Sequence, residues 1–256
     1  MLLAIDSGNT NVVFAVYDGE QPRGRWRASS DAGRTADEYA VWLTQLMALD
    51  GLSASDIDGA IIASVVPPTV YTLKTLCSQY FGVKPLLVGD PDVDLGIEIK
   101  AQQVGADRLV NAVAGHAAYG GALIIIDFGT ATSFDVIAPD GSYEGGVIAP
   151  GVNLSVEALY KASAQLPRIA VVRPENVIGK ATVPAMQSGL YWGYVAMIDG
   201  VVARIKAETG WPMTVIATGG LAPLFAEACE SIDYSDPDLT ASGLALIYRT
   251  NRAQPA

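Results

Sequence analysis

The sequence has few of the residues that build metal centres and disulfide frameworks. It contains two cysteines, Cys77 and Cys229, and one histidine, His116, in 256 residues. The two cysteines are far apart in the sequence, form no Cys-x-x-Cys pair and lie in apolar stretches typical of helices. A Cys/His zinc site and a disulfide-stabilised fold are therefore excluded, and we expect both thiols to be reduced.

Basic charge is also scarce. The chain carries 16 lysines and arginines against 27 aspartates and glutamates, a net charge of −11. General nucleic-acid binding needs a basic surface to neutralise the phosphate backbone, so we expect no nucleic-acid partner. An anionic ligand would have to be held by local donors, because the overall field of the protein repels it.

Long hydrophobic runs are absent. No stretch approaches the ~20 apolar residues of a membrane span. The apolar residues 1–5 are too short for a signal peptide and lack its basic flank. Half of the residues are hydrophobic and only 17% are charged, which excludes a disordered chain. We expect a cytoplasmic protein with no membrane partner, built from one large or two modest domains.

Strand and helix patterns alternate along the chain, which predicts an α/β fold. Thr35 and Glu38 form a capping box ahead of a helix. Short strands are expected at 2–5, 12–17, 23–28, 60–66, 85–88, 122–126, 134–138, 143–148 and 213–217, and those at 2–5, 60–66 and 122–126 are expected to be buried. Further helices are expected at 70–81, from Gly105 to 119, 184–208, 221–230 and 240–249.

The two halves of the chain repeat one plan. The run LLAIDSG at 2–8 matches LIIIDFG at 123–129, and the turn Asp18-Gly19 recurs as Asp140-Gly141. Two matched landmarks in the same order indicate a duplicated domain. We predict two duplicated α/β domains, residues 1–115 and 116–256, with a ligand cleft between them.

The duplicated Asp-x-Gly bends, at 6–8 and 127–129, suit a nucleotide. A carboxylate at a strand end can hold a cation, and a glycine lets backbone N–H groups approach a phosphate. A third element, Thr218-Gly219-Gly220 after strand 213–217, would let a nucleoside lie against the backbone. The alternative is an ordinary turn, in which Asp-x-Gly is common, but duplication at matched positions favours a phosphate site.

Other nucleotide signatures fail. Gly179-Lys180 resembles the end of a P-loop, but Pro174 stands where the first glycine should be and Ala181 where Ser or Thr should follow. No Gly-x-Gly-x-x-Gly follows a strand, so a dinucleotide-binding fold has no support.

The motifs DSGNTN at 6–11, DFGTATS at 127–133 and ATGG at 217–220 resemble the phosphate-1, phosphate-2 and adenosine motifs of the actin-like superfamily of acetate and sugar kinases. That superfamily has ribonuclease-H-like domains. Over roughly residues 1–250 the chain is similar, more specifically, to type III pantothenate kinases. The further strings that carry this resemblance are VGADR at 104–108, GGVIAPGV at 145–152, LPRI at 166–169, IGKAT at 178–182 and AMQSG at 185–189.

The resemblance implies an ATP-dependent kinase that phosphorylates the primary hydroxyl of pantothenate to 4'-phosphopantothenate, the first step of coenzyme A biosynthesis. It implies a homodimer, with Asp107 as general base, Asp6 near Mg²⁺ and Asp127 on a monovalent cation, K⁺ or NH₄⁺. The implied ATP contacts are Asp6, Ser7, Gly8, Asn9, Thr10, Asn11, Val12, Val13, Thr130, Gly219 and Gly220. The implied pantothenate contacts are Gly105, Ala106, Asp107, Arg108 and Thr182.

Several of these residues have plainer alternatives. Asp107 is also a first-turn acid of the kind that the helix dipole favours, and Arg108 could be a surface ion-pair partner. Thr182 could cap a helix ahead of Pro184, and we expect His116 to have a packing or surface role. One departure stands out: relatives usually carry a substrate-contacting tyrosine just before VGADR, and residues 96–103 contain none.

Two other classes of protein compete with the kinase. The family includes accessory regulators of transcription, but Asp6, Asp107 and Asp127 favour catalysis, and the acidic charge argues against DNA contact. Filament-forming or chaperone ATPases of the superfamily have inserted subdomains that 256 residues cannot hold.

Overall fold

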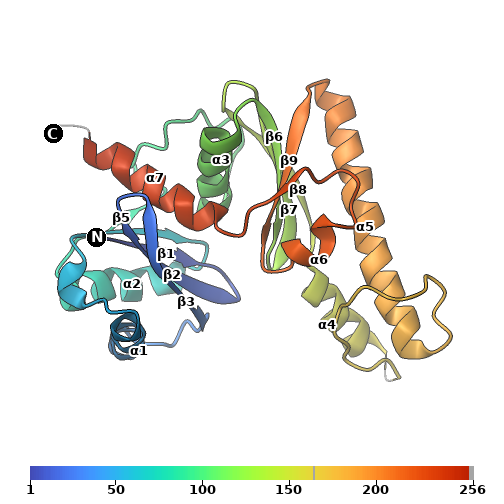
Figure 1. The fold of residues 1–256 in the computed structure, drawn as a ribbon, viewed down its shortest axis with the longest axis horizontal. Coiled ribbons are helices and arrows are strands. Elements are labelled where there is room, and N and C mark those ends of the chain that lie inside the picture. The colour runs from blue at the N-terminus through green and yellow to red at the C-terminus, as the bar shows by residue number, and fades with distance from the viewer. Residues whose placement is uncertain (164, 254–256) are drawn as a thin grey trace. The chain divides into compact units, whose positions relative to one another are not determined.

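The computed structural model describes residues 1–163 and 165–253, which divide into two compact units (Figure 1). The first unit comprises Met1–Ile97, Gln102–Ala114 and the described residues from Asp238 to Ala253. The second comprises Glu98–Ala101 and Gly115–Pro237.

The first unit is built on a five-stranded sheet in the order β3-β2-β1-β4-β5. β1 pairs antiparallel with β2, β2 pairs antiparallel with β3, and β4 and β5 continue the sheet in parallel. Both faces of β1 are buried, because its alternate side chains enter two separate hydrophobic clusters. The strands are β1 (Leu2–Ser7), β2 (Asn11–Asp18), β3 (Gln21–Ser29), β4 (Gly59–Ser64) and β5 (Leu86–Leu87).

Helices cover both faces of this sheet. Leu3 and Ile5 pack against residues of α1 (Ala36–Leu49) and α2 (Pro67–Tyr80). Leu2 and Ala4 pack on the other face, against α7 (Leu239–Ala253) and the first part of α3 (Ala106–Tyr119). A short 3-10 helix, η1 (Ala54–Asp56), precedes β4.

The second unit repeats the plan with the sheet β10-β9-β6-β7-β8. Three helices cover one face, and the aromatic residues Tyr191, Tyr194 and Phe225 fill the core between helix and sheet. The strands are β6 (Ala122–Phe128), β7 (Ala131–Ile137), β8 (Tyr143–Pro150), β9 (Met213–Gly219) and β10 (Tyr234–Ser235). The helices are α4 (Val152–Ala162), α5 (Thr182–Thr209) and α6 (Ala222–Ala226).

The structure confirms the predicted duplication. Each sheet runs antiparallel over its first three strands in the sequence and parallel over the remaining two. Asp6 of β1 pairs with Val13, and Asp127 of β6 pairs with Ser133. Each sheet also has a register shift at one place, between Val16 and Tyr17 and between Val136 and Ile137.

Some elements differ from their prediction. α2 begins at Pro67, because proline suits the first turn of a helix, where its missing N–H costs nothing. α4 was not predicted, and α6 is much shorter than the expected helix at 221–230. The predicted second domain included the C-terminal helix, whereas α7 belongs to the first unit, because its apolar face packs on β1 and β4.

Candidate nucleotide and substrate site

The phosphate-1 bend connects β1 to β2 and is closed by a hydrogen bond from the Gly8 amide to the Asn11 carbonyl, 2.9 Å. The side chains of Ser7 and Val12 are fully buried, while Asn9 and Thr10 are exposed. Asp6 is partly exposed at the carboxyl end of β1. Ser7 and Val12 can therefore offer a ligand only their backbone, whereas Asp6, Asn9 and Thr10 can offer side chains.

A cluster of hydroxyls fixes this bend from inside the unit. Ser7 Oγ lies 2.9 Å from Thr69 Oγ1, and Ser64 Oγ lies 3.4 Å from the same atom. Thr69 in turn donates to the Val66 carbonyl at 2.8 Å. Sequence reasoning did not single out Thr69 or Ser64; the one available signal was a serine near the end of a buried strand, shortly before Pro67.

The GADR segment lies in the same unit as the phosphate-1 bend. The Val65 amide donates to the Ser7 carbonyl at 3.1 Å, and Gly105 stands against the Val65 side chain. Asp107 is in the first turn of α3, partly buried, and its Oδ1 accepts a hydrogen bond from the Arg108 amide at 2.8 Å. The structure therefore links Gly105 to the loop that follows Asp6.

Burial raises the pKa of the Asp107 carboxyl above its usual value, although the backbone amide and the positive charge of Arg108 pull that pKa down. Desolvation disfavours the charged form, and here it outweighs both opposing effects. A carboxylate with a raised pKa is a better proton acceptor than one in water. This environment suits a general base.

The phosphate-2 bend follows β6 and is closed in the same way, by the Gly129 amide donating to the Ala131 carbonyl at 3.0 Å. β9 runs parallel to β6 and pairs Asp127 with Thr218 and Phe128 with Gly219. Gly219 has a φ of +90°, and a Cβ atom there would lie 2.5 Å from Asp127 Oδ1. The predicted cation ligand and the adenosine motif are therefore in contact within the second unit.

Thr130 is exposed on this bend and lies beside the start of α4. A Cβ at Gly151, the N-cap of α4, would lie 2.1 Å from the Thr130 carbonyl oxygen. Only glycine permits this approach of the two backbones. The unpredicted helix α4 thus fixes the position of Thr130.

Thr182 is the first residue of α5 and is exposed. The N-cap is Ala181, so Thr182 does not cap the helix as the alternative supposed. It lines an apolar cavity of about 410 Å³ with Leu159 of α4 and Met186 and Leu190 of α5.

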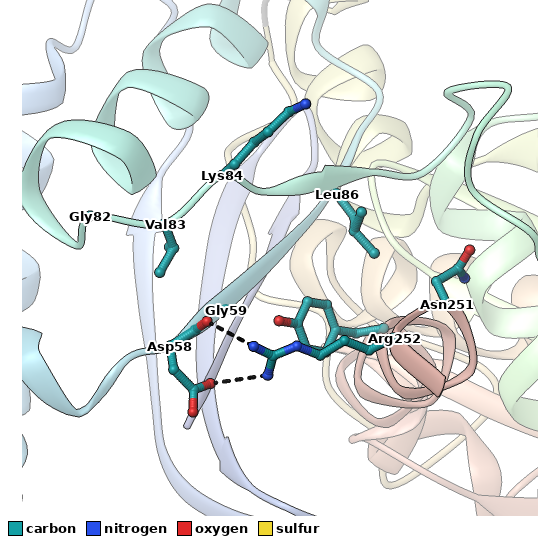
Figure 2. Close-up of a pocket in the computed structure, with 9 residues that line it drawn as sticks. Asp58, Gly59, Gly82, Val83, Lys84, Leu86, Asn251 and Arg252 are labelled. Carbon is teal, nitrogen blue, oxygen red and sulfur yellow. Dashed lines mark hydrogen bonds and ion pairs between the residues drawn. The ribbon is translucent and has the colours of Figure 1, made fainter. Parts of the chain in front are cut away.

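Another cavity, of about 390 Å³, lies in the first unit away from the bend (Figure 2). Its lining includes Asp58, Lys84 and Arg252. It lies beside Gly59, the first residue of β4, whereas the hydroxyl cluster contains Ser64, the last residue of that strand. This cavity therefore does not belong to the phosphate-1 bend.

Among the described residues, no group of three or more His, Cys, Asp or Glu side chains could hold a metal ion by itself. Within the first unit, Asp6 could supply a single hard oxygen ligand near the end of β1. Such a ligand fits Mg²⁺, which takes one or two carboxylates and completes its shell with phosphate oxygens and water. In the part of the chain that the structure describes, no helix has both the length and the apolar character to cross a membrane.

His116 has the packing role that was expected. Its ring stands against Gly141 in the β7–β8 turn, and Nε2 lies 3.4 Å from the Pro139 carbonyl oxygen.

The fold defines the class of protein. A glucokinase from Streptomyces griseus, solved with glucose and AMPPNP, matches 99% of each chain with a TM-score of 0.58 at 13% identity. A conserved protein from Campylobacter jejuni, described as a Baf family transcriptional activator, matches 98% of this chain and 100% of its own with a TM-score of 0.65 at 18% identity. The chain therefore has the same duplicated ribonuclease-H-like fold as these solved proteins.

Sequence comparison identifies the family. The type III pantothenate kinase family matches residues 2–204. The type III pantothenate kinase of Rhodospirillum rubrum is 65% identical over 98% of this chain and 99% of its own. That of Paramagnetospirillum magneticum is 64% identical over 98% of both. The chain belongs to the type III pantothenate kinase family, a family of ATP-dependent kinases, and these relatives do not favour the regulator alternative.

Proposed function

We propose that this chain transfers the γ-phosphate of ATP to the primary hydroxyl of pantothenate and so forms 4'-phosphopantothenate. Family membership supports the reaction, and the observation that carries the assignment of roles is the environment of Asp107. This carboxyl combines a raised pKa with a position on α3 next to Gly105, which contacts the segment bonded to the phosphate-1 bend.

In this proposal Asp107 accepts the proton of the primary hydroxyl while the hydroxyl oxygen bonds to the γ-phosphorus. The bond from that phosphorus to the β–γ bridging oxygen breaks, and ADP leaves. Alcohols are poor nucleophiles, so a positioned base and charge neutralisation supply most of the catalysis. Arg108, the neighbour of Asp107, offers a planar donor fork that suits the pantothenate carboxylate. Gly105, Ala106 and Thr182 are the other proposed pantothenate contacts.

The proposed nucleotide contacts are those that the resemblance implies, and the geometry of the bends supports some of them. The exposed Asn9 and Thr10 and the amides around Gly8 would take phosphate oxygens in the first unit. The assigned residues are Asp6, Ser7, Gly8, Asn9, Thr10, Asn11, Val12, Val13, Thr130, Gly219 and Gly220. Ser7 and Val12 would contribute backbone atoms, because their side chains are buried.

Two oxygen sites would hold cations. Mg²⁺, brought with ATP, would neutralise phosphate charge near Asp6. A monovalent cation, K⁺ or NH₄⁺, would bind at Asp127, whose carboxylate stands against the Gly219 backbone. Carboxylate and carbonyl oxygens together are the ligands that a hard cation prefers.

The activity is tested by coupled ADP release with and without pantothenate, in K⁺ and then in Na⁺. Turnover that needs both pantothenate and K⁺ is expected. Asp107→Asn should keep ATP binding and lose about 10²- to 10⁴-fold in kcat, the usual contribution of a general base. Retention of more than about a tenth of kcat contradicts the base role. ATP binding with no pantothenate-dependent turnover supports the regulator instead.

We also propose a homodimer that forms through the second unit. Apolar side chains are exposed there in a limited part of the sequence, including Ile148 and Ile178 at 64% and 81%. The others between residues 147 and 183 are Val147, Leu154, Leu159, Tyr160, Val172, Val177 and Val183. Such a concentration of exposed apolar residues is typical of an association surface. A monomer at micromolar concentration in light scattering would refute this.

A cytoplasmic location is part of the same proposal. It is supported by the use of ATP and by two free, buried cysteines, Cys77 and Cys229. Fractionation of cells that produce the chain tests it.

A further inference from the structure

Arg34 lies in the turn between β3 and α1 and is a partly buried cation that forms no ion pair with the described residues. Its Nη1 atom is shielded from solvent and has no hydrogen-bond partner. Among the residues that the structure describes, no carboxylate lies within ion-pair distance of it, although the chain is rich in acids. A buried charge without a partner is costly, so its presence calls for an explanation.

Two other arginines, Arg168 and Arg252, show that Arg34 lacks an ion pair within the described part of the chain. Arg34, Arg168 and Arg252 each stack on a tyrosine ring, with Cζ 5.0, 5.0 and 5.5 Å from the ring centroid. Arg168 also pairs with Glu157 at 2.8 Å. Arg252 pairs with Asp58 at 3.5 Å, as Figure 2 shows. Arg34 has the same ring contact, on Tyr39, but no carboxylate within ion-pair distance among the described residues.

The acids nearest to Arg34 in the sequence already accept hydrogen bonds from other groups, and Asp37 accepts one from the Tyr80 hydroxyl. The Glu38 carboxylate is bonded to Thr35, because its Oε2 accepts hydrogen bonds from the Thr35 amide at 2.8 Å and from the Thr35 hydroxyl at 2.9 Å. Asp31 Oδ1 accepts from the Gly33 amide at 2.8 Å. These bonds fold the turn and the helix start, and they keep both carboxylates on local donors.

Tyr39 also has a buried polar atom without a hydrogen-bond partner in the described residues. Its side chain is fully buried, and its hydroxyl has no hydrogen-bond partner. Burial raises the pKa of the Tyr39 hydroxyl, and nearby Arg34 acts in the opposite direction. The two groups are close, yet a neutral hydroxyl cannot neutralise a guanidinium. The pair therefore still lacks an anion.

The turn that carries Arg34 is attached to the phosphate-1 bend. The Ser30 amide donates to the Thr10 carbonyl at 2.9 Å, and Ser29 pairs with Asn11 in the β2–β3 ladder. Tyr39 packs on Phe14 of β2, with ring centroids 5.5 Å apart. Both members of the pair are thus tied to the strand and bend that begin the proposed nucleotide site.

We propose that Arg34 binds a phosphate oxygen of the nucleotide at the phosphate-1 bend, and that the ring face of Tyr39 positions its guanidinium. The inference rests on the proposed nucleotide site. Arginine suits this task because its planar fork matches phosphate oxygens and it remains charged when partly buried. It is a local donor of the kind that a protein of net charge −11 needs to hold an anion.

The test measures ATP and ADP dissociation constants by titration calorimetry at fixed ionic strength. Arg34→Ala should weaken ATP binding about 10- to 100-fold, the usual effect of losing a charge-assisted hydrogen bond. Arg34→Lys keeps the positive charge without the planar fork, so its ATP affinity should lie between those of the wild type and Arg34→Ala. Tyr39→Leu removes the ring face and should weaken ATP binding less than Arg34→Ala does, and this effect should largely disappear when Arg34 is already alanine.

Arg252→Ala is the matched control. This substitution also removes an arginine that stacks on a tyrosine, and it changes the net charge by the same amount. Arg252, however, lies beside the first residue of β4 and pairs with Asp58 (Figure 2). We expect it to leave nucleotide binding unchanged. The urea midpoint supplies a second readout, because removing an unpaired charge at Arg34 should not lower it, whereas a purely structural role would.

Three results would overturn the inference: equal ATP affinity for wild type and Arg34→Ala, an equal loss in Arg252→Ala, or a rise in the pantothenate KM with ATP binding unchanged. Absence of ATP binding by the wild-type protein is a different outcome, since it refutes the proposed nucleotide site itself.

Discussion

Gly219→Ala tests the contact between the adenosine motif and Asp127 most directly. Gly219 has a φ of +90°, a conformation that side chains disfavour. The added Cβ would lie 2.5 Å from Asp127 Oδ1 and 2.8 Å from both N and O of Phe128. The last two atoms are backbone and cannot move aside without disturbing the β6–β9 pairing.

The expected loss follows from these two effects. The positive φ costs an alanine about 1–2 kcal/mol. Overpacking against fixed atoms adds about 1–3 kcal/mol. We therefore expect the free energy of unfolding to fall by about 2–5 kcal/mol, out of a total that is typically about 5–15 kcal/mol. Urea unfolding followed by tryptophan fluorescence measures this loss as a lower midpoint.

Gly220→Ala is the control for stability. The next glycine has nothing within 4 Å of an added Cβ and no positive φ. Its substitution should change the free energy of unfolding by less than about 0.5 kcal/mol, as for an ordinary surface change. Equal urea midpoints for the two variants would refute the close approach at Asp127. We also expect Gly219→Ala to weaken activation by K⁺, because it displaces the carboxylate proposed to hold that cation.

Three further predictions concern buried groups. Because the pKa of Asp107 is raised in the folded protein, its ionised form destabilises the fold, and Asp107→Asn should raise Tm at pH 7. The gain in Tm should vanish below the unfolded pKa of about 3.9, where the carboxyl is protonated in both states. A lower Tm of Asp107→Asn at pH 7 would contradict the raised pKa. Thr69→Val should leave the buried Ser7 hydroxyl poorly bonded and lower the free energy of unfolding in urea by about 1–3 kcal/mol. Adding Ser7→Ala should recover part of this free energy, because the unpaired hydroxyl is then removed. Cys77 and Cys229 should react with a thiol reagent only as the protein unfolds, because burial raises the pKa of each to about 12; rapid labelling of the native protein would exclude this.

Local patterns predicted much of the fold. The Thr35 capping box, the buried runs at β1 and β6 and the repeated Asp-x-Gly bends all depend on short-range chemistry, and each is present. α4 was missed because glycine and proline residues before it are typical of turns. The match of the phosphate-1, phosphate-2 and GADR motifs also sufficed to name the family that sequence comparison later showed.

Other features of the site depend on contacts between distant residues. Thr69 supports the phosphate-1 bend only because β4 lies beside β1, and Gly219 meets Asp127 only because β9 runs parallel to β6. Neither pairing has a signal in the sequence.

The sequence by itself determined the duplicated α/β plan, the acidic surface and the positions of the candidate carboxylates, because these follow from composition, periodicity and short motifs. Only the tertiary structure decided which sheet face α7 covers, that burial raises the pKa of Asp107, and that the buried Nη1 atom of Arg34 has no hydrogen-bond partner among the residues described. Burial, desolvation and the pairing of charges arise from atoms that the fold alone brings together.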